Sequence, residues 1–465
     1  MAFRPVERVA LVVASLASFL TPFMGAATNV ALPSIGREFG ADAVLLTWVS
    51  ASYLLAAAAL LVPIGRLADI YGRKRTFVAG LVAYTLTSWL CAWSSSMGSL
   101  IAARALQGTA GAMIFGTNVA IVTSVFPPAR RGLALGLNVA AVYLGLSLGP
   151  FLGGLLVDHY GWRSIFTANV LLGVVATVAT VWKLEGEWAG AKGERFDLAG
   201  SLLYVLALTA LMYGASRLPD AAGALLLLLG LAAGVAFGRW ELRTKYPLVD
   251  LLLFARNRVF AMGNLAALIN YSATFAVGFL MSLYLQYVRA FSPAAAGTIL
   301  VSQPVVMAIV SPFAGRLSDR VESRVVASLG MAAVAAGLFL LALVGSRTPL
   351  PFIVFALLVL GCGFGLFSSP NTNAVMGAVA PPLYGVASAT LATMRLTGQM
   401  LSMGVAMLIL TVFVGREPVT PANEAAFLHA VRTALVVFGA LCVAGTFASL
   451  ARGRDLPPEP LSPEP

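Results

Sequence analysis

The stretch Gly65-Arg66-Leu67-Ala68-Asp69-Ile70-Tyr71-Gly72-Arg73-Lys74-Arg75 ends a long apolar run. Its first five residues return 250 positions later as Gly315-Arg316-Leu317-Ser318-Asp319. A second pair, spaced by 253, is Arg131-Gly132-Leu133-Ala134 and Tyr384-Gly385-Val386-Ala387. Two matches in register indicate an internal duplication, so we expect two six-helix halves. Duplicated halves that meet along an axis normal to the membrane are a transporter architecture, with the substrate site between them near the midplane.

The composition places the chain in a membrane. Hydrophobic residues make up 59% of the 465 residues, charged residues make up 11%, and the mean hydropathy is +0.90. A soluble domain carries about 25% charged residues, which excludes a cytosolic enzyme or a secreted disulfide scaffold. The net charge of +11 is spread over loops rather than gathered on a soluble domain, which excludes nucleic acid as a partner. The three cysteines, Cys91, Cys362 and Cys442, lie in separate apolar runs and predict neither disulfides nor a metal site.

The apolar runs divide the chain into membrane spans, each needing about 20 residues. We expect an all-α multi-pass membrane protein with 14 transmembrane helices, near 9–32, 45–68, 76–94, 99–124, 132–157, 164–182, 198–216, 223–240, 259–286, 294–316, 325–345, 351–380, 384–413 and 425–451. The predicted units are an N-terminal six-helix half (1–182), two extra helices with flanking cytoplasmic loops (183–258), a C-terminal six-helix half (259–451) and a disordered cytoplasmic tail (452–465). Pro370 predicts a kinked or broken helix in the span 351–380.

Lysine and arginine predict the orientation. One set of loops holds about 21 of these residues and the opposite set about 7, and the positive-inside rule places the richer set in the cytoplasm. Both termini are then cytoplasmic, as an even number of spans requires.

The loop from Gly65 to Arg75 joins two helices that we expect to pack closely. Its glycines permit a tight turn, and Asp69 stands where it can cap a helix or pair with Arg73. The loop resembles the signature loop of the major facilitator superfamily. This resemblance implies a conformational role for the loop and its repeat, at Gly65, Asp69, Gly72, Arg73, Gly315 and Asp319.

Further motifs resemble the export branch of that superfamily. The run Arg104-Ala105-Leu106-Gln107-Gly108 resembles its arginine motif, and 145–154 resembles its antiporter motif. The motif residues there are Gly145, Gly149, Pro150, Gly153 and Gly154; such glycines allow close helix approach, and proline bends a helix. The stretches 29–33, 161–166, 284–286, 361–365 and 370–371 are similar to those of fourteen-helix drug/proton antiporters. The resemblance implies a cell (inner) membrane transporter for multidrug-type efflux by alternating access with proton antiport.

The first helix departs from this family at one position. Members usually carry an aspartate five residues before the residue matched by Asn29, and this chain has Met24 there. The other acids map to span ends or loops, so no buried carboxylate is placed to carry a proton. The charges deep within spans are instead Arg104, which can snorkel, and Arg395, which needs carbonyls, water or a substrate anion.

Polar and adaptable side chains within the spans form the candidate substrate cavity: Met24, Arg104, Asn118, Asn138, Tyr143, Asn270, Tyr271, Gln303, Asn371, Asn373, Arg395 and Gln399. Each alone is more often helix–helix glue or packing than a ligand contact. Their aromatic, apolar and amide chemistry suits a small lipophilic or amphiphilic substrate. The alternative is an exporter or flippase of an anionic lipid or amphiphile, with or without proton coupling, whose head group meets Arg104 or Arg395.

Other function classes fit this sequence less well. Short loops and the lack of a soluble signalling domain argue against a receptor or assembly partner. His159 and His429 map to the outer rim, apart from any catalytic set, so an enzyme is not expected. No catalytic residue, cofactor or metal site is predicted. The expected partners are the substrate, membrane lipids and, through the resemblance, protons, and the protein is expected to be a monomer.

Overall fold

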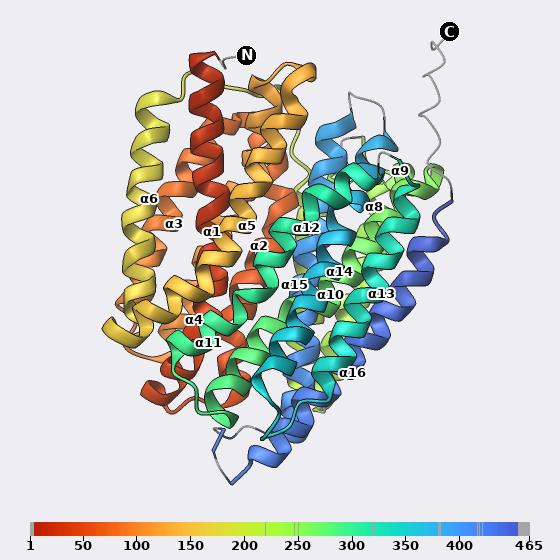
Figure 1. Cartoon of the computed structure of the whole chain (residues 1–465). Coiled ribbons are helices and arrows are strands. Elements are labelled where there is room, and N and C mark those ends of the chain that lie inside the picture. The colour runs from red at the N-terminus through yellow and green to blue at the C-terminus, as the bar shows by residue number, and fades with distance from the viewer. Residues whose placement is uncertain are drawn as a thin grey trace.

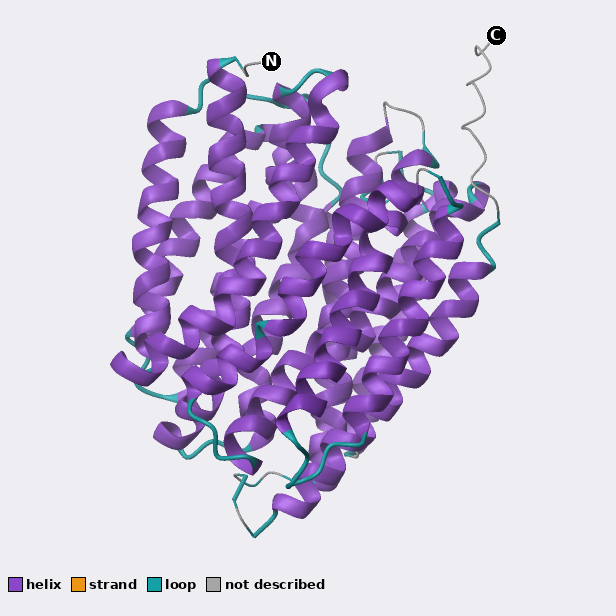
Figure 2. Cartoon of the chain, viewed as in Figure 1, coloured by secondary structure: helices purple, strands orange, loops and turns teal. Residues whose placement is uncertain are grey.

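The computed structural model describes residues 4–218, 220–245, 247–249, 251–318, 320–379, 383–415, 417, 419–420 and 422–453. Its elements are α1 (Pro5–Phe39), α2 (Ala43–Tyr71), α3 (Arg73–Ala92), α4 (Met97–Val125), α5 (Pro128–Tyr160), α6 (Arg163–Lys183), α7 (Leu198–Arg217), α8 (Ala221–Glu241), α9 (Leu251–Arg256), α10 (Arg258–Leu283), the π-helix η1 (Tyr284–Val288), α11 (Pro293–Leu300), α12 (Ser302–Ser318), α13 (Ser323–Ala342), α14 (Leu350–Gly377), α15 (Tyr384–Phe413) and α16 (Glu424–Leu450). All regular structure in these residues is helical (Figure 2).

The predicted all-α membrane fold is confirmed. Among the described residues, thirteen helices are long and apolar enough to cross a membrane by length and composition. In this count of thirteen, α10 and η1 together form one span, and α11 and α12 together form another. The long helix that this count leaves out is α3. It has 20 residues, and Arg73, Lys74 and Arg75 in its first turn lower its mean hydropathy. With α3, fourteen helical spans match the fourteen predicted runs.

Proline interrupts the helices at a different place from the one predicted. The sequence predicted a kink or a break at Pro370. The prediction of a break is wrong, because α14 continues through Pro370 to Gly377. The interruption lies instead at Val301, between α11 and α12. Pro304 lacks the amide hydrogen that would bond the carbonyl of Leu300, so the helical hydrogen bonding loses a link at this point.

The helices pack as two bundles and a hairpin (Figure 1). In the N-terminal bundle α1 packs on α5, α2 on α4, and α3 on both α4 and α6. In the C-terminal bundle α10 packs on α15, α12 on α14, and α13 on both α14 and α16. The α7–α8 pair forms an antiparallel hairpin in which Gly214, Gly223 and Gly230 approach the opposite backbone or side chains too closely for a Cβ. The bundles meet mainly where α2 contacts α15 and where α5 contacts α11.

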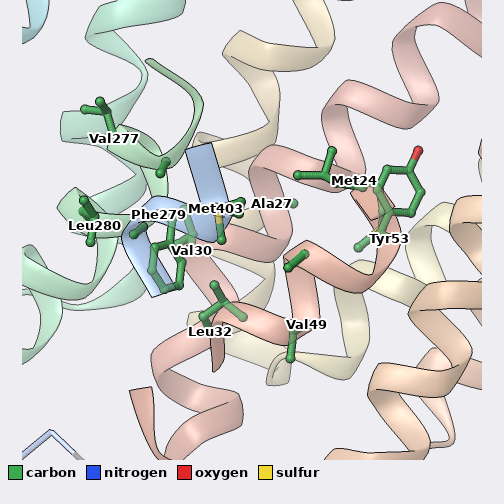
Figure 3. Close-up of a cluster of buried hydrophobic side chains, with 14 of the residues drawn as sticks. Met24, Ala27, Val30, Leu32, Val49, Tyr53, Val277, Phe279, Leu280 and Met403 are labelled. Atoms are coloured by element: carbon green, nitrogen blue, oxygen red, sulfur yellow. The ribbon is translucent and has the colours of Figure 1, made fainter. Parts of the chain in front are cut away.

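The contacts between the halves gather at one end of the bundle. We call the end with the α1–α2 turn the outer end and the opposite end cytoplasmic, after the predicted orientation; α1 begins and α16 finishes at the cytoplasmic end (Figure 1). At the outer end Ser282 Oγ donates to the carbonyl of Asn29 at 2.7 Å, and Gln286 Nε2 donates to that of Val30 at 2.9 Å. Apolar side chains of α1, α2, α10 and α15, among them Val30 and Leu280, are buried in one cluster (Figure 3). Together with the contact of α5 with α11, they form the outer seal.

Candidate transport pathway

Tyr143 of α5 reaches from the N-terminal half to the C-terminal half near the middle of its helix. Its hydroxyl lies 3.3 Å from Ser311 Oγ on α12 and donates to Ser368 Oγ on α14 at 3.3 Å. The two serines belong to the other half, so the three hydroxyls bridge the halves at the depth of the membrane core. The sequence predicted Tyr143 as a pathway residue but gave no signal for the serines, because isolated hydroxyls are common in membrane helices.

Arg395 of α15 lies on the C-terminal side of this bridge. Its Nη2 donates to Thr372 Oγ1 at 2.8 Å, and its guanidinium carbon lies 5.7 Å from the centroid of the Tyr271 ring. Tyr271 also interacts with Ser368, which joins this group to the bridge. The Arg395 Nε is buried without a hydrogen-bond partner, and no carboxylate in the described part of the chain pairs with this arginine. An arginine carries five donors, so donors remain for a ligand.

These six side chains form what we call the central cluster: Tyr143, Tyr271, Ser311, Ser368, Thr372 and Arg395. The Phe364 ring packs edge-on against Tyr271, with centroids 5.3 Å apart. The cluster therefore combines an aromatic wall, several hydroxyls and one positive charge. That combination can hold an amphiphile by its polar end while apolar surface contacts the remainder.

Arg104, the other predicted intramembrane arginine, has its partners within the N-terminal half. It is 2% exposed; its Nε donates to the carbonyl of Val49 at 3.1 Å, and Nη1 donates to Gln107 Oε1. Its guanidinium carbon lies 4.5 Å from the centroid of the Tyr53 ring. Gln107 in turn donates to Ser88 Oγ at 2.7 Å. This network ties α2, α3 and α4 together and leaves Arg104 little opportunity to meet a substrate.

Met24 occupies a closed apolar site. It is 0% exposed and belongs, with Tyr53, to the buried cluster that joins α1 to α2 (Figure 3). A thioether there fills space without carrying charge. The residue that replaces the family's aspartate thus packs in the core of this conformation.

Two of the predicted amides bond to each other through a serine. Ser18 Oγ donates to Asn138 Oδ1, and Asn118 Nδ2 donates to Ser18 Oγ at 2.6 Å. The three residues come from α1, α5 and α4 and are all buried. They fit helix–helix glue, and the sequence analysis missed Ser18.

Asn371 and Asn373 lie near the cytoplasmic end of α14. Asn371 Nδ2 donates to the carbonyl of Gly263 at 3.0 Å, and its Oδ1 accepts from Arg452 Nη1 at 3.0 Å. Arg452, the first residue of the predicted tail, is 0% exposed; 454–465 lie outside the described residues. Asn373 is exposed and donates to Ser318 Oγ at 3.2 Å. Neither asparagine joins the central cluster.

The remaining predicted side chains are distributed around the C-terminal half. Asn270 is 0% exposed, and neither of its amide atoms has a hydrogen-bond partner among the described residues. Gln303 and Gln399 are half-buried. The carbonyl of Gln303 lies where a Cβ on Gly361 would come within 2.4 Å, so Gly361 is needed for the close contact of α12 with α14.

The signature loop is built around Asp69 and Arg73. Arg73 Nε pairs with Asp69 Oδ1 at 2.7 Å, and Arg73 Nη1 donates to Ser124 Oγ on α4 at 2.7 Å. Gly72 begins α3 with a φ of +126°, a conformation that side chains rarely adopt. A Cβ on Gly116 would lie 3.3 Å from the Cα of Gly65, which explains the small residue at position 116, whereas a Cβ on Gly65 would meet nothing within 4 Å.

The repeat of the signature loop is described only in part. A Cβ on Gly315 would lie 2.8 Å from Ser369 Oγ, so α12 approaches α14 closely there. Asp319 lies outside the described residues.

The export motif forms two glycine seams on α5. Added Cβ atoms on Gly145, Gly149 and Gly153 would meet α1 at 2.5–2.7 Å, at the Phe19 carbonyl and at the side chains of Ala26 and Ala27. On the other side, a Cβ on Gly154 would meet the Pro293 carbonyl of α11 at 2.5 Å. A Cβ on Gly297 of α11 would meet the Pro150 carbonyl at 2.0 Å. The motif therefore packs α5 against its own half and against the other half at the outer seal.

The described carboxylates lie in the end turns of helices or in loops: Glu7, Glu38, Asp42, Asp69, Asp158, Glu185, Glu187, Glu194, Asp197, Asp220, Glu241, Glu322, Glu417 and Glu424. Several bond to neighbouring arginines. Glu7, 1% exposed, pairs with Arg4 at 2.8 Å and Arg130 at 3.4 Å, and Glu38 pairs with Arg163 at 2.7 Å. Within the described chain, the membrane core holds arginine but no acid.

Known proteins resemble this chain along most of its length. The Riboflavin transporter RibZ of Clostridioides difficile is 30% identical over 390 residues, covering 83% of this chain and 84% of RibZ. The Multidrug resistance protein Stp of Mycobacterium tuberculosis is 33% identical, covering 86% of this chain and 75% of Stp. The Cephamycin export protein CmcT of Amycolatopsis lactamdurans is 34% identical, covering 97% of this chain and 94% of CmcT.

A solved structure with the same fold is that of a bacterial homologue of the human lysosomal transporter Spinster, in an inward-facing and unoccupied conformation. Its TM-score is 0.70 at 15% identity, and the match covers 97% of this chain and 98% of that one. The family model described as Major Facilitator Superfamily matches residues 14–195 and 263–465. The protein is therefore a transporter that belongs to the major facilitator superfamily.

Proposed function

We propose that this protein exports small lipophilic or amphiphilic compounds from the cytoplasm by alternating access of its two halves. The relatives named for multidrug resistance and cephamycin export support the direction, and the one named for riboflavin supports a small organic substrate. The observation that carries the proposal is the central cluster, where Tyr143 joins both halves on the cytoplasmic side of the outer seal.

In this proposal the described conformation faces the cytoplasm. The outer seal is closed by the Ser282 and Gln286 bonds to α1 and by the α5–α11 glycine seam. A substrate that reaches the central cluster competes for the long hydroxyl contacts of Tyr143, which are 3.3 Å each. Rocking of the halves then opens the outer seal, where most of the bonds are made to backbone carbonyls and can be exchanged for water.

Proton coupling is proposed to differ from that of the fourteen-helix drug/proton antiporters this chain resembles. A proton carrier in a membrane core is usually a buried carboxylate whose protonation shifts with the substrate. Met24 stands at the family's acidic position. Transport is thus either uncoupled from protons or coupled through an acid at the rim, such as Asp42 or Asp158.

A second candidate function is the export or flipping of an anionic lipid or amphiphile. It is favoured by Arg395, whose donors are only partly used by Thr372 and which has no described acidic partner. A buried arginine is stabilised by an anion, and its planar donors suit a carboxylate or phosphate. Arg104, the other arginine considered for this role, is committed to Val49 and Gln107.

Transport by the purified protein in liposomes tests both candidates. A pair of amphiphiles with the same apolar body, one with a carboxylate and one with a quaternary ammonium, is offered to wild type and to Arg395→Gln. Selective loss of anion transport in the variant supports the second candidate. Equal transport of both compounds by both proteins supports the first, and no transport of either removes both.

We further propose that the protein works as a monomer in the cell membrane with both termini in the cytoplasm. The asymmetry of lysine and arginine between the loops supports this orientation.

A further inference from the structure

The segment 184–194, which connects α6 to the extra helix pair, lies on the signature loop. Glu187 accepts from the backbone N–H of Lys74 at 2.8 Å and of Arg75 at 3.2 Å, through its two carboxylate oxygens. These are orphan donors of the first turn of α3, whose N-cap is Gly72 and has no side chain to satisfy them. An acid at a helix N-terminus is also favoured by the helix dipole. Glu187 therefore supplies a cap from more than a hundred residues away.

Three more bonds join the same two segments. The N–H of Arg73 donates to the carbonyl of Trp188 at 2.8 Å, and the N–H of Ala191 donates to the carbonyl of Asp69 at 2.9 Å. Farther along, Arg66 of α2 forms an ion pair with Glu194. The backbone bonds fix the register of the segment, and the carboxylates hold it from both ends. We call this set of contacts the linker clasp.

The hairpin that follows the clasp contacts both halves of the transporter. α7 meets α2 where Tyr204 donates to the carbonyl of Ala58 at 3.3 Å and where the rings of Trp48 and Tyr213 lie 6.0 Å apart. Toward the C-terminal half, α7 packs on α15. If the halves rock apart, one of these two contacts must slide.

The α7–α15 contact is suited to sliding. Met212 Sδ lies where a Cβ on Gly404 would come within 3.2 Å, so a flexible thioether rests on a bare stretch of helix. The Tyr204 hydroxyl, which donates to the carbonyl of Ala58 on α2, also interacts with Thr397 of α15. The contacts toward α2, by contrast, continue into the linker clasp at the cytoplasmic end.

We infer that the linker clasp fixes the α7–α8 hairpin to the N-terminal half, so that the hairpin moves with that half and slides along α15 during transport. The signature loop then has a second role, as the anchor of the extra helices. This inference rests on alternating access, which belongs to the proposed function, and extends it to a part of the chain with no assigned role.

Distances between spin labels at the outer end test the inference. Cysteines replace three exposed residues in a protein whose native Cys91, Cys362 and Cys442 are changed to alanine. Asp220→Cys labels the hairpin, Ser95→Cys the N-terminal half and Ser346→Cys the C-terminal half. The Ser95–Ser346 pair reports alternation itself, so a failure of alternating access is seen separately from a failure of the clasp.

A bulky side chain placed in the α5–α11 contact, which we call a wedge, should force the two halves apart at the outer end. Gly297→Leu clashes with the Pro150 carbonyl and should lengthen the Ser95–Ser346 distance, with Gly154→Leu as a second wedge. Gly136→Leu is the control, because nothing lies within 4 Å of its added Cβ. We expect the Asp220–Ser95 distance to stay at its wild-type value while Asp220–Ser346 lengthens. A shift of Asp220–Ser95 with either wedge would overturn the inference.

The clasp is tested without any conformational change by Glu187→Ala combined with Glu194→Ala. Loss of both carboxylates should broaden the Asp220–Ser95 distance distribution in the wild-type conformation. Glu185→Ala is the matched control, an exposed acid in the same segment. If the double variant keeps the narrow distribution of the control, the clasp does not hold the hairpin, whatever the wedges do.

Discussion

The guanidinium of Arg395 lies over the ring of Tyr271, with its carbon 5.7 Å from the ring centroid, and donates to Thr372 at 2.8 Å. Stacking on an aromatic face uses the plane of the guanidinium and leaves the in-plane donors for other partners. One of those donors, Nε, has no partner among the described residues. A positive charge in this setting lowers the free energy of binding an anion and raises that of binding a cation.

Replacing Arg395 by glutamine should lower the transport of an anionic amphiphile by about tenfold or more, since a hydrogen bond to a charged group contributes about 1.5–3 kcal/mol. Transport of a matched cationic compound should change little or rise. The measurement is initial uptake into liposomes at several concentrations.

Arg104→Gln is the contrasting variant. It removes a donor from the Val49 carbonyl and a partner from Gln107, so it should lower stability, with about 1–3 kcal/mol for each buried group left unsatisfied. Selectivity between anion and cation should stay as in wild type. A lower melting temperature with unchanged selectivity separates Arg104 from Arg395, whereas a selectivity change would place Arg104 on the pathway.

Asp69→Asn should lower the rate of transport while leaving substrate affinity within a few-fold of wild type. The change weakens the 2.7 Å ion pair with Arg73, which holds α2 and α3 to α4 at the cytoplasmic end, far from the central cluster. Rates and half-saturation concentrations from the same liposomes check it. A loss of affinity at an intact rate would contradict the conformational role.

Gly145→Val should destabilise the protein by roughly 1–3 kcal/mol, the usual cost of overpacking a tight contact. A Cβ at this position would lie 2.5 Å from the Phe19 carbonyl, a backbone atom of α1 that cannot rotate away. Gly136→Val, with open space around it, is the control for helix propensity. Thermal unfolding followed in detergent should separate the two variants; equal melting temperatures would mean that α1 and α5 can part without cost.

Transport should depend little on pH between about 6 and 8. The membrane core of the described residues holds no carboxylate whose protonation could change over this range. Met24→Asp should gain pH dependence, because it places an ionisable carboxyl in the closed apolar site on α1. Met24→Asn is the isosteric control.

The assay is uptake with and without an imposed pH gradient. Strong proton-driven accumulation by the natural sequence, unaffected by Asp42→Asn and Asp158→Asn, would show that a group other than a carboxylate at the rim carries the proton.

Reporter fusions check the orientation. A fusion after Trp188 or Leu248 should report a cytoplasmic location, and one after Asp220 an external location. A cytoplasmic signal after Asp220 would mean that α7 and α8 do not cross the membrane.

The sequence by itself determined the class of fold and the fourteen spans. Lipid satisfies no backbone hydrogen bonds, so each span must be helical, and the length and apolar character of a span can be read from its own residues. The duplication of the loop at Gly65 and Gly315 could also be found from the sequence, because a repeat is recognised by comparing residues along the chain. The glycines of the export motif could be assigned to close helix contacts, although not to particular partners.

The tertiary structure decided which of these side chains have unused bonding capacity. The sequence offered both Arg104 and Arg395 as contacts for an anionic head group, but Arg104 is bonded to Val49 and Gln107, whereas Arg395 keeps a donor beside Tyr271. Glu187 reads as a solvated loop acid until the fold places it at the start of α3. These outcomes depend on partners that lie up to 124 residues away along the chain, and hydrogen bonds act over about 3 Å in space regardless of that separation.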